Sequence, residues 1–511
     1  NCKSLTFLDL STFNTGTFIN MENMFDSCSS LEYIDLSNFK TASVTNMKSL
    51  FQNCINIKAL DLTSFNVKKV RNMEYMFKNC KSLTLLDLNN FITRNAINMK
   101  EMFYGCESLK DINIANFDTQ KVEDMSRMFY DCSSLVNISL INFDTKLVED
   151  MSYMFYHCAN LTSIDLSSFN TNSTKNMRAM FYKCESLTFL DLSHFDNTVT
   201  KDMGFIFANC FSLSVLDLSR FNTSNVINME YMFYSCLSIY SLNLSFFQTN
   251  NVEYMNNMFA LCNSIKYLDL SNFDTSSVKN MEFMFSNCKS LDYLDIYSFY
   301  TTNVNNMRNM FESCIKLISI NFDQNYFITQ NVTDMQYMFS NCKELISLNI
   351  SLFETPFVTN MRNMFESCKK LEIIEPLNFD TSKVTDMQYM FYNCRNLREL
   401  NTSHFKTNFV TNMESMFELC QKLISIDVSN FETSKVINME KMFSNCQTIT
   451  FLDISNFKGL NVKTTKKMFE FCSKLTYLNL HNFDTSKVTD ISYMFNECRD
   501  LKNIDITTTG S

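Results

Sequence analysis

The chain has 511 residues, of which 46% are apolar and 19% charged, and its formal net charge at pH 7 is -10. This composition is too apolar for a disordered chain, and the acidic balance disfavours a nucleic-acid partner, which is bound through clustered Lys and Arg. No apolar run approaches the roughly 18 residues that a membrane helix needs, so no membrane span is expected.

A strict repeat runs through the whole chain. All 20 cysteines recur at intervals of 26 residues, except from Cys314 to Cys342, where the interval is 28. All 34 methionines fall in two columns, those of Met47 and Leu50. Phe fills the column of Phe51 in all 19 complete repeats. Such strictness indicates that each column has one packing environment, repeated along the chain.

The repeat defines the domain organisation. We predict a single solenoid over residues 1–511, with a two-residue insertion near 321–326. The insertion is interpreted first as a tolerated slip and second as a loop that contributes to a site. Pro376 removes a backbone donor, so a locally weak strand is expected there. Because Asn1 already lies inside a repeat, we expect the chain to be part of a longer protein.

Each repeat combines two periodicities. The apolar residues of 73–83 recur at i+3, i+4, i+7 and i+10, which predicts a short helix. Leu86, Asp87 and Leu88 then alternate, which predicts a strand with the leucines inward and the Asp outward. Asn or Asp precedes the first Met position in 17 of 19 repeats, as Asn46 does, and suits a helix N-cap.

One strand and one short helix cannot bury their own apolar face, whereas stacked repeats share a continuous core. The expected fold is therefore an α/β repeat, a leucine-rich-repeat solenoid of about 20 coils. A continuous parallel β-sheet should cover one face and short helices the other. At about 4.8 Å between strands, this sheet would extend on the order of 90–100 Å.

The segment from Cys28 to Phe39 resembles the leucine-rich-repeat pattern LxxLxLxxN, with Phe39 in place of Asn. The other half of the repeat, Asn-Met-x-x-Met-Phe-x-x-Cys-x-x-Leu, is similar to the BspA-like leucine-rich-repeat surface proteins. The resemblance covers essentially the whole chain. It implies a leucine-rich-repeat solenoid, an extracellular or cell-surface location, and adhesion to protein or glycan.

The cysteines are interpreted as small buried residues of the core, because neighbouring helices would hold them too far apart for disulfides. A line of thiols also suits a metal poorly, since tetrahedral zinc needs converging ligands. We therefore expect free thiols, no metal and no cofactor. The representatives of the structural columns are Cys28, Cys54, Met47, Phe51 and Asn46.

The outward strand column holds 12 Asp and six Asn in 20 repeats. Carboxylates at strand spacing repel one another, so the column is either a solvated face with side-chain ladders or a site for cations or a basic ligand. Exposed aromatics lie two residues earlier, either as a binding surface or through strand propensity alone. The candidate binding residues are Tyr267, Asp269, Tyr293, Asp295, Tyr297, Phe451 and Tyr477.

A second tyrosine stripe, which includes Tyr153 and Tyr231, follows the predicted helices. Packing between neighbouring helices is its expected role, and lateral assembly is the alternative if the rings stay exposed. The four histidines fall in three columns, and no two of them lie in the same or adjoining repeats. No phosphate-binding glycine loop occurs either, so no catalytic residues are predicted.

The sequence favours a non-catalytic cell-surface binding or adhesion ectodomain that recognises protein or glycan. The alternative is a structural subunit of an extracellular fibre or surface layer that assembles through solenoid edges or ends, and self-association is possible in either case. An intracellular interaction scaffold would share the same folded features.

Overall fold

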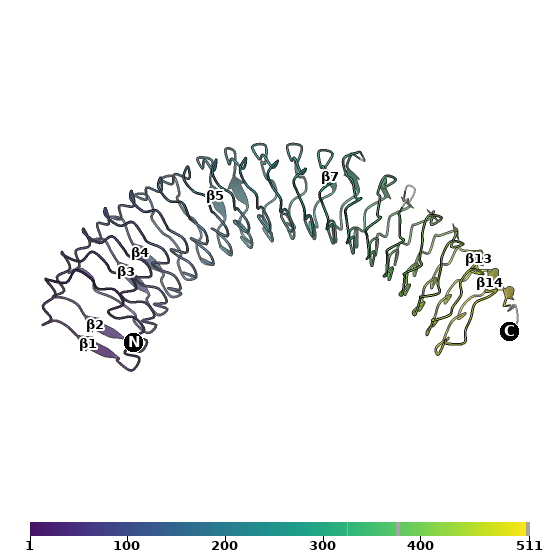
Figure 1. The fold of residues 1–511 in the computed structure, drawn as a ribbon, viewed down its shortest axis with the longest axis horizontal. Coiled ribbons are helices and arrows are strands. Elements are labelled where there is room, and N and C mark those ends of the chain that lie inside the picture. Colours follow the sequence, from purple (N-terminus) through teal and green to yellow (C-terminus); the bar gives the residue numbers. More distant parts are fainter. Residues whose placement is uncertain (324, 375–378, 507–511) are drawn as a thin grey trace. The chain divides into compact units, whose positions relative to one another are not determined.

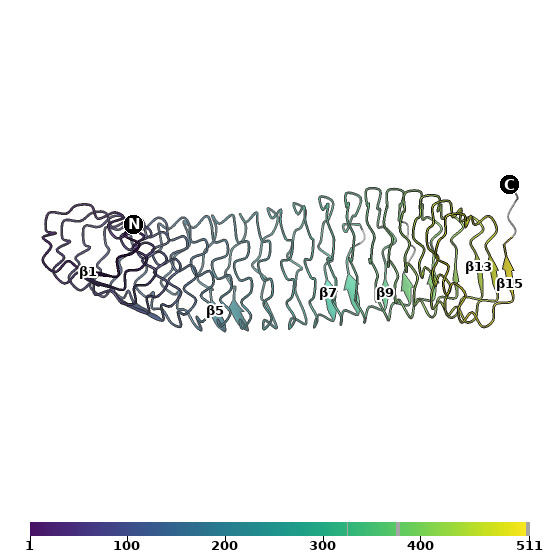
Figure 2. The same cartoon turned by 90° about the horizontal axis from the view of Figure 1, so that it is seen from below.

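A computed structural model describes residues 1–323, 325–374 and 379–506. The chain forms two compact units, Asn1–Val252 and Glu253–Ser511. Each unit is a stack of successive coils, one coil for each repeat (Figure 1 and Figure 2). The chain winds through about 19 coils in all, with parallel strands, as the repeat predicts.

The strands are only two or three residues long. In the first unit they pair as β1–β2, β3–β4 and β5–β6, and in the second as β7–β8, β9–β10, β11–β12 and β13–β14–β15. The prediction of one continuous sheet is therefore wrong for the described residues, where seven short sheets occur. The strands are β1 Phe7–Asp9, β2 Tyr33–Asp35, β3 Leu85–Asp87, β4 Asp111–Asn113, β5 Phe189–Asp191, β6 Val215–Asp217, β7 Tyr293–Asp295, β8 Ser319–Asn321, β9 Ser347–Leu348, β10 Ile373–Ile374, β11 Glu399–Leu400, β12 Ser425–Ile426, β13 Phe451–Asp453, β14 Tyr477–Asn479 and β15 Asn503–Asp505.

A second ladder of parallel bridges follows the Asn column. It joins consecutive coils from Asn20 to Asn228 in the first unit and from Tyr254 to Asp490 in the second. The Asn46 side chain accepts a hydrogen bond from the backbone N–H of Lys48 at 3.0 Å. The predicted hydrogen bond from a backbone N–H to the Asn side chain is therefore present, but it stabilises a turn and not the start of a helix.

The prediction of helices at the Met-x-x-Met-Phe segments is wrong, because the described part of the chain contains no helix. Every second N–H bonds instead to the following coil. The Met47 N–H donates to the Asn72 carbonyl at 3.0 Å, and the Ser49 N–H to the Glu74 carbonyl at 2.9 Å. The N–H between them turns back, as that of Leu50 does to the Met47 carbonyl at 3.3 Å.

This alternation requires two left-handed residues per coil, for example Tyr75 and Asn79, both at φ 60°. Each such residue other than Gly costs roughly 1 kcal/mol. A short helix would instead leave roughly four N–H and four C=O groups without partners in every coil. Pairing with neighbouring coils satisfies these groups, which is the physical reason that turns replace the helix.

Replacing Lys441 by Gly and by Ala should show whether position 441 has a left-handed or a helical backbone, because the two conformations reverse the order of stability of these variants. Lys441 lies at φ 57° and its N–H donates to the Lys466 carbonyl at 2.9 Å. Both variants lose the side chain, but only Gly relieves the left-handed strain, so Gly should be more stable than Ala by about 1 kcal/mol. In a helix the order reverses, with Gly less stable by about 1 kcal/mol. Hydrogen exchange in this coil measures the difference.

The apolar columns fill the interior as their spacing predicts. The side chains of Met47, Leu50, Phe51 and Cys54 are fully buried. The Phe rings stack from coil to coil, for example Phe285 on Phe259 with a centroid separation of 5.8 Å. Within each unit the core is thus a set of columns of stacked side chains.

A buried threonine column links successive turns. The Thr145 hydroxyl donates to the Asn170 carbonyl at 2.8 Å and accepts from the Asn170 N–H at 2.7 Å. Thr145 thus satisfies one donor and one acceptor of the next coil. Pro376, where a weak strand was expected, lies outside the described residues. No helix in the described part of the chain could cross a membrane.

Candidate functional site

The candidate residues of the second unit lie on the outward side of the short strands. In β7, Tyr293 and Asp295 are directed outward, and Leu294 between them is fully buried. β7 pairs with β8 in a register that places Tyr293 beside Ser319 and Asp295 beside Asn321. Period-two alternation therefore presents a Tyr and an Asp from one strand on the same face.

The carboxylates of the Asp column hold the turn that follows each strand. Asp295 accepts hydrogen bonds from the Tyr297 N–H at 3.1 Å and from the Asn321 amide at 3.1 Å. Hydrogen bonds from the Ser271 hydroxyl and N–H lower the pKa of Asp269. These contacts favour the solvated-face interpretation of the column, because turn and amide donors of the chain itself surround the negative charge.

The insertion supplies a partner for Tyr297. The Tyr297 hydroxyl forms a hydrogen bond with the Asp323 carboxylate, which raises the pKa of Tyr297. The Asn325 N–H, together with the Tyr297 hydroxyl, lowers the pKa of Asp323. The ring of Tyr297 is 56% exposed, so it is fixed at its tip while its faces stay accessible.

The insertion also brings two further tyrosines together. The rings of Tyr300 and Tyr326 lie 4.5 Å apart, and both are exposed. Phe322 lies with its ring centroid 5.1 Å from that of Phe327. We call Tyr297, Tyr300 and Tyr326 the tyrosine cluster. Tyr300 was not among the residues predicted from the sequence, whereas Asp323 and Tyr326 lie in the insertion, whose second interpretation was a loop that contributes to a site.

Tyr267 and Asp269 lie one coil earlier. Tyr267 is 57% exposed and belongs to the segment 265–270, in which no strand is assigned. In the described part of the chain its ring stacks on no neighbour. The structure therefore joins Tyr293, Asp295 and Tyr297 in one coil and leaves Tyr267 as a separate exposed ring beside them.

Phe451 and Tyr477 form a second aromatic patch on β13 and β14. Their rings are stacked with centroids 5.3 Å apart and planes 4° apart. A hollow of about 310 Å³ lies beside Phe451 and is also lined by Asp427 and Asp453. An aromatic surface next to carboxylates thus occurs at two places in the second unit.

The cysteine column is buried except at Cys2, which is exposed, and Cys498, which is half-buried. The described chain contains 20 free cysteines. Cys28 and Cys54 are buried, the Cys54 thiol lies 3.2 Å from the Phe25 carbonyl as a donor, and burial raises the pKa of Cys54 to about 12. Such thiols stay protonated and are poor nucleophiles. No group of three or more His, Cys, Asp or Glu suited to a metal occurs among the described residues.

The tyrosine stripe on the turn side of the first unit packs against itself. The rings of Tyr104 and Tyr130 lie 4.4 Å apart, those of Tyr130 and Tyr156 4.2 Å, and those of Tyr156 and Tyr182 4.8 Å. Burial raises the pKa of Tyr130 well above its usual range. These rings find their contacts within the chain, in agreement with the packing expectation, although between turns instead of helices.

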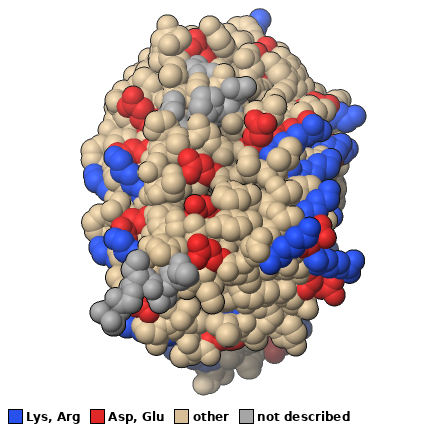
Figure 3. All heavy atoms as spheres, turned by 90° about the vertical axis from the view of Figure 1, so that its right-hand side faces the viewer, with Lys and Arg blue, Asp and Glu red and all other residues tan. Residues whose placement is uncertain are grey.

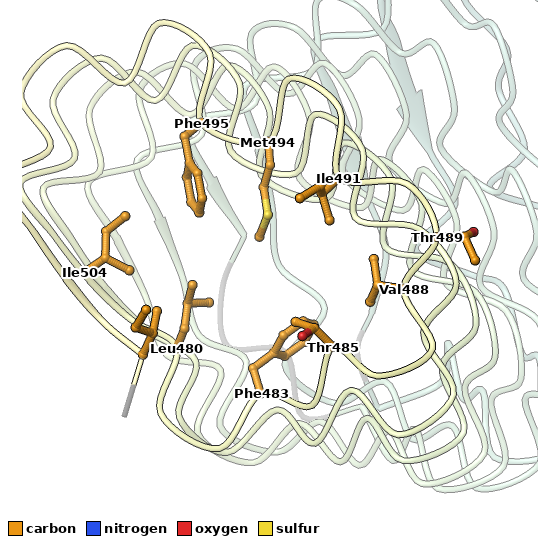
Figure 4. Close-up of a pocket in the computed structure, with 10 residues that line it drawn as sticks. Leu480, Phe483, Thr485, Val488, Thr489, Ile491, Met494, Phe495 and Ile504 are labelled. Atoms are coloured by element: carbon orange, nitrogen blue, oxygen red, sulfur yellow. The ribbon is translucent and has the colours of Figure 1, made fainter. Parts of the chain in front are cut away.

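A hollow of about 690 Å³ opens among the last described coils (Figure 4). Figure 4 shows Phe483, Met494, Phe495 and Ile504 around it. These side chains belong to the apolar columns that fill the core of the earlier coils. The hollow is therefore the open side of the core, and we assign it no ligand.

Solved structures similar to this chain are leucine-rich repeat proteins. One from Bacteroides ovatus is 19% identical, covers 64% of this chain and 80% of its own, and has a TM-score of 0.38. One from Eubacterium ventriosum is 14% identical over 72% and 82%, with a TM-score of 0.31. A leucine rich cell surface protein from Faecalibacterium prausnitzii is 15% identical over 89% and 84%, with a TM-score of 0.21. TM-scores this low carry no argument about function.

No curated protein matches the chain. A family described as "Mycoplasma protein of unknown function, DUF285" matches it five times in succession, over residues 1–112, 98–216, 201–323, 315–424 and 396–508. The matches overlap and follow the repeat through both units. The chain therefore belongs to the DUF285 family.

Proposed function

We propose that this chain is a non-catalytic binding module that recognises protein or glycan through the outward strand side of its second unit. The observation that carries the proposal is the tyrosine cluster beside Tyr293, where exposed rings lie next to Asp323. Exposed tyrosines offer apolar area and a hydroxyl together, which is why they dominate many binding surfaces.

The cluster is held in place before any partner arrives. Tyr297 is tethered to Asp323, and Tyr300 is packed against Tyr326. Side chains that are already ordered lose little conformational entropy on binding. Asp269 and Asp323 add a negative field, so a cationic or hydroxyl-rich partner fits this surface best.

We further propose that the binding serves adhesion at a cell surface, as in a BspA-like protein. It rests on the resemblance of the Asn-Met-x-x-Met-Phe-x-x-Cys-x-x-Leu repeat to that group. An extracellular location follows from the same resemblance. The alternative, a fibre or surface-layer subunit that assembles through its edges, has less support, because the turn-side tyrosines 104, 130, 156 and 182 are occupied by one another.

A binding comparison tests the proposal. The chain is applied to immobilised matrix glycoproteins and to a glycan array, and Kd is measured for each positive. Replacing Tyr267, Tyr293 and Tyr297 by Ser should weaken that binding at least about tenfold, since hot-spot residues contribute roughly 2 kcal/mol each.

The matched control replaces turn-side Tyr153 and Tyr231 by Ser, and thermal unfolding is recorded for both variants. The control should bind as the parent chain does. Loss of binding in the control, with binding retained in the strand-side variant, would place the working surface on the turn side and favour lateral assembly.

A further inference from the structure

A row of basic residues follows the cysteines in the second unit. Six consecutive coils, from Cys288 to Cys420, each place at least one Lys or Arg one or two positions after the Cys. We call this row the lysine ridge; it consists of Lys289, Lys316, Lys343, Lys369, Lys370, Arg395 and Lys422. Figure 3 shows Lys and Arg side chains along both flanks of the face it presents, most densely on the right.

The concentration is specific to these coils. The two positions hold seven basic residues and one acidic residue, Glu344, in the six coils of the ridge. In the first eleven coils the same positions hold two basic and two acidic residues. A chain of net charge -10 therefore gathers positive charge in one place.

Most residues of the ridge form no ion pair within the described residues, whereas a lysine of the same column in the first unit does. In the same column of the first unit, Lys81 forms an ion pair at 2.7 Å with Glu107, one coil away. Within the part of the chain that the structure describes, Lys370 pairs with Glu344, and no other ridge lysine forms an ion pair. Like charges at roughly 4.8 Å coil spacing repel one another, so a bound polyanion would stabilise the ridge.

A hollow lies along the ridge. It measures about 470 Å³ and is lined by Asp292, Ile315, Lys316, Ile318, Lys343 and Glu344. Ile318 is 46% exposed, so the hollow combines an apolar wall with the ammonium groups of Lys316 and Lys343 and the carboxylates of Asp292 and Glu344. A sugar ring can lie against the isoleucine while its charged substituents meet the lysines.

The geometry points to the lysine ridge as a binding site for a linear sulfated polysaccharide. Five spacings between six coils give the ridge a length of roughly 25 Å, which suits an extended chain with anionic groups at regular intervals. Nucleic acid fits less well, because neither position carries an aromatic ring in these coils on which a base could stack. This inference does not depend on the proposed tyrosine surface.

Heparin is the probe for a direct test. Its Kd for the purified chain is measured at rising salt concentration, beside desulfated heparin and single-stranded oligothymidine. The ridge variant replaces Lys316, Lys343 and Lys369 by Gln. It should bind heparin at least about tenfold more weakly at low salt, and the dependence of log Kd on log salt should decrease by about two to three.

The control variant, Lys69→Gln with Arg71→Gln and Lys121→Gln, removes the same charge from another basic hollow, which lies in the first unit and is lined by these three residues. It should retain parental heparin binding, and both variants should unfold at the parental temperature. Three results would overturn the proposal: parental binding by the ridge variant, equal binding of desulfated heparin, or preference for oligothymidine. Loss of glycoprotein binding in the tyrosine variant with heparin binding intact would separate the two sites.

Discussion

Replacing Gly459 by Ala is expected to destabilise its coil by about 2–4 kcal/mol, since strain in the left-handed region and overpacking add. Gly459 has φ 65°, and an added Cβ would lie 2.3 Å from the carbonyl oxygen of Asp484. That neighbour is backbone in the next coil, so it cannot rotate away. Hydrogen exchange of the coils around residues 459–485 measures the local loss.

Gly16 provides the matched control. An added Cβ there would find Asn14 at 3.7 Å and Lys40 at 3.9 Å, which are ordinary contacts, and its φ is not left-handed. Gly16→Ala should leave stability within about 1 kcal/mol of the parent or raise it, because Ala restricts the unfolded chain. Equal behaviour of the two variants would contradict the inter-coil packing described for Gly459.

The buried threonine column predicts the second large effect. Thr145→Val keeps the shape of the side chain but removes the hydroxyl that serves the Asn170 carbonyl and N–H. A buried group left without a partner costs about 1–3 kcal/mol, so we expect a loss of about 2–3 kcal/mol in urea unfolding or hydrogen exchange.

Thr145→Ser is the control, because Ser retains the hydroxyl and loses one methyl group. It should cost about 1 kcal/mol. The natural sequence shows what happens without the hydroxyl: Val67 occupies the same column, and the Ile92 N–H in the next coil turns to the Asn90 carbonyl at 3.2 Å. If the Val variant is as stable as the Ser variant, the Asn170 N–H has found another acceptor, as the Ile92 N–H does beside Val67.

The repeat pattern correctly predicted which residues face inward. It did not predict the backbone conformation of these residues, which form turns and not a helix. The spacing of Met47, Leu50, Phe51 and Cys54 suits one face of a helix, and it suits a series of turns equally well. Asn, Asp or Gly precedes the Cys in nine of 19 coils, and these residues tolerate left-handed φ. That column was the available sign of turns, whereas bonds between coils are invisible in a single repeat.

The strand residues of the candidate site could be predicted from the alternation of inward and outward side chains. The contacts made by the insertion could not be predicted. Tyr293 and Asp295 are outward because strand residues alternate. Asp323 and Tyr326 reach Tyr297 and Tyr300 only because two extra residues redirect the loop. The repeat pattern cannot predict where the side chains of an insertion lie. The contacts of Asp323 and Tyr326 were therefore found only in the structure.

Hydroxyl-radical footprinting of the chain, alone and bound to a glycoprotein or glycan that it captures, tests the binding proposal most directly. Tyrosine oxidation is read by mass spectrometry of peptides. Binding should protect Tyr293, Tyr297 and Tyr326 from oxidation and leave the oxidation of Tyr153 and Tyr156 unchanged. Protection of Tyr153 and Tyr156, with no change at Tyr297, would contradict a binding surface on the strand side of the second unit.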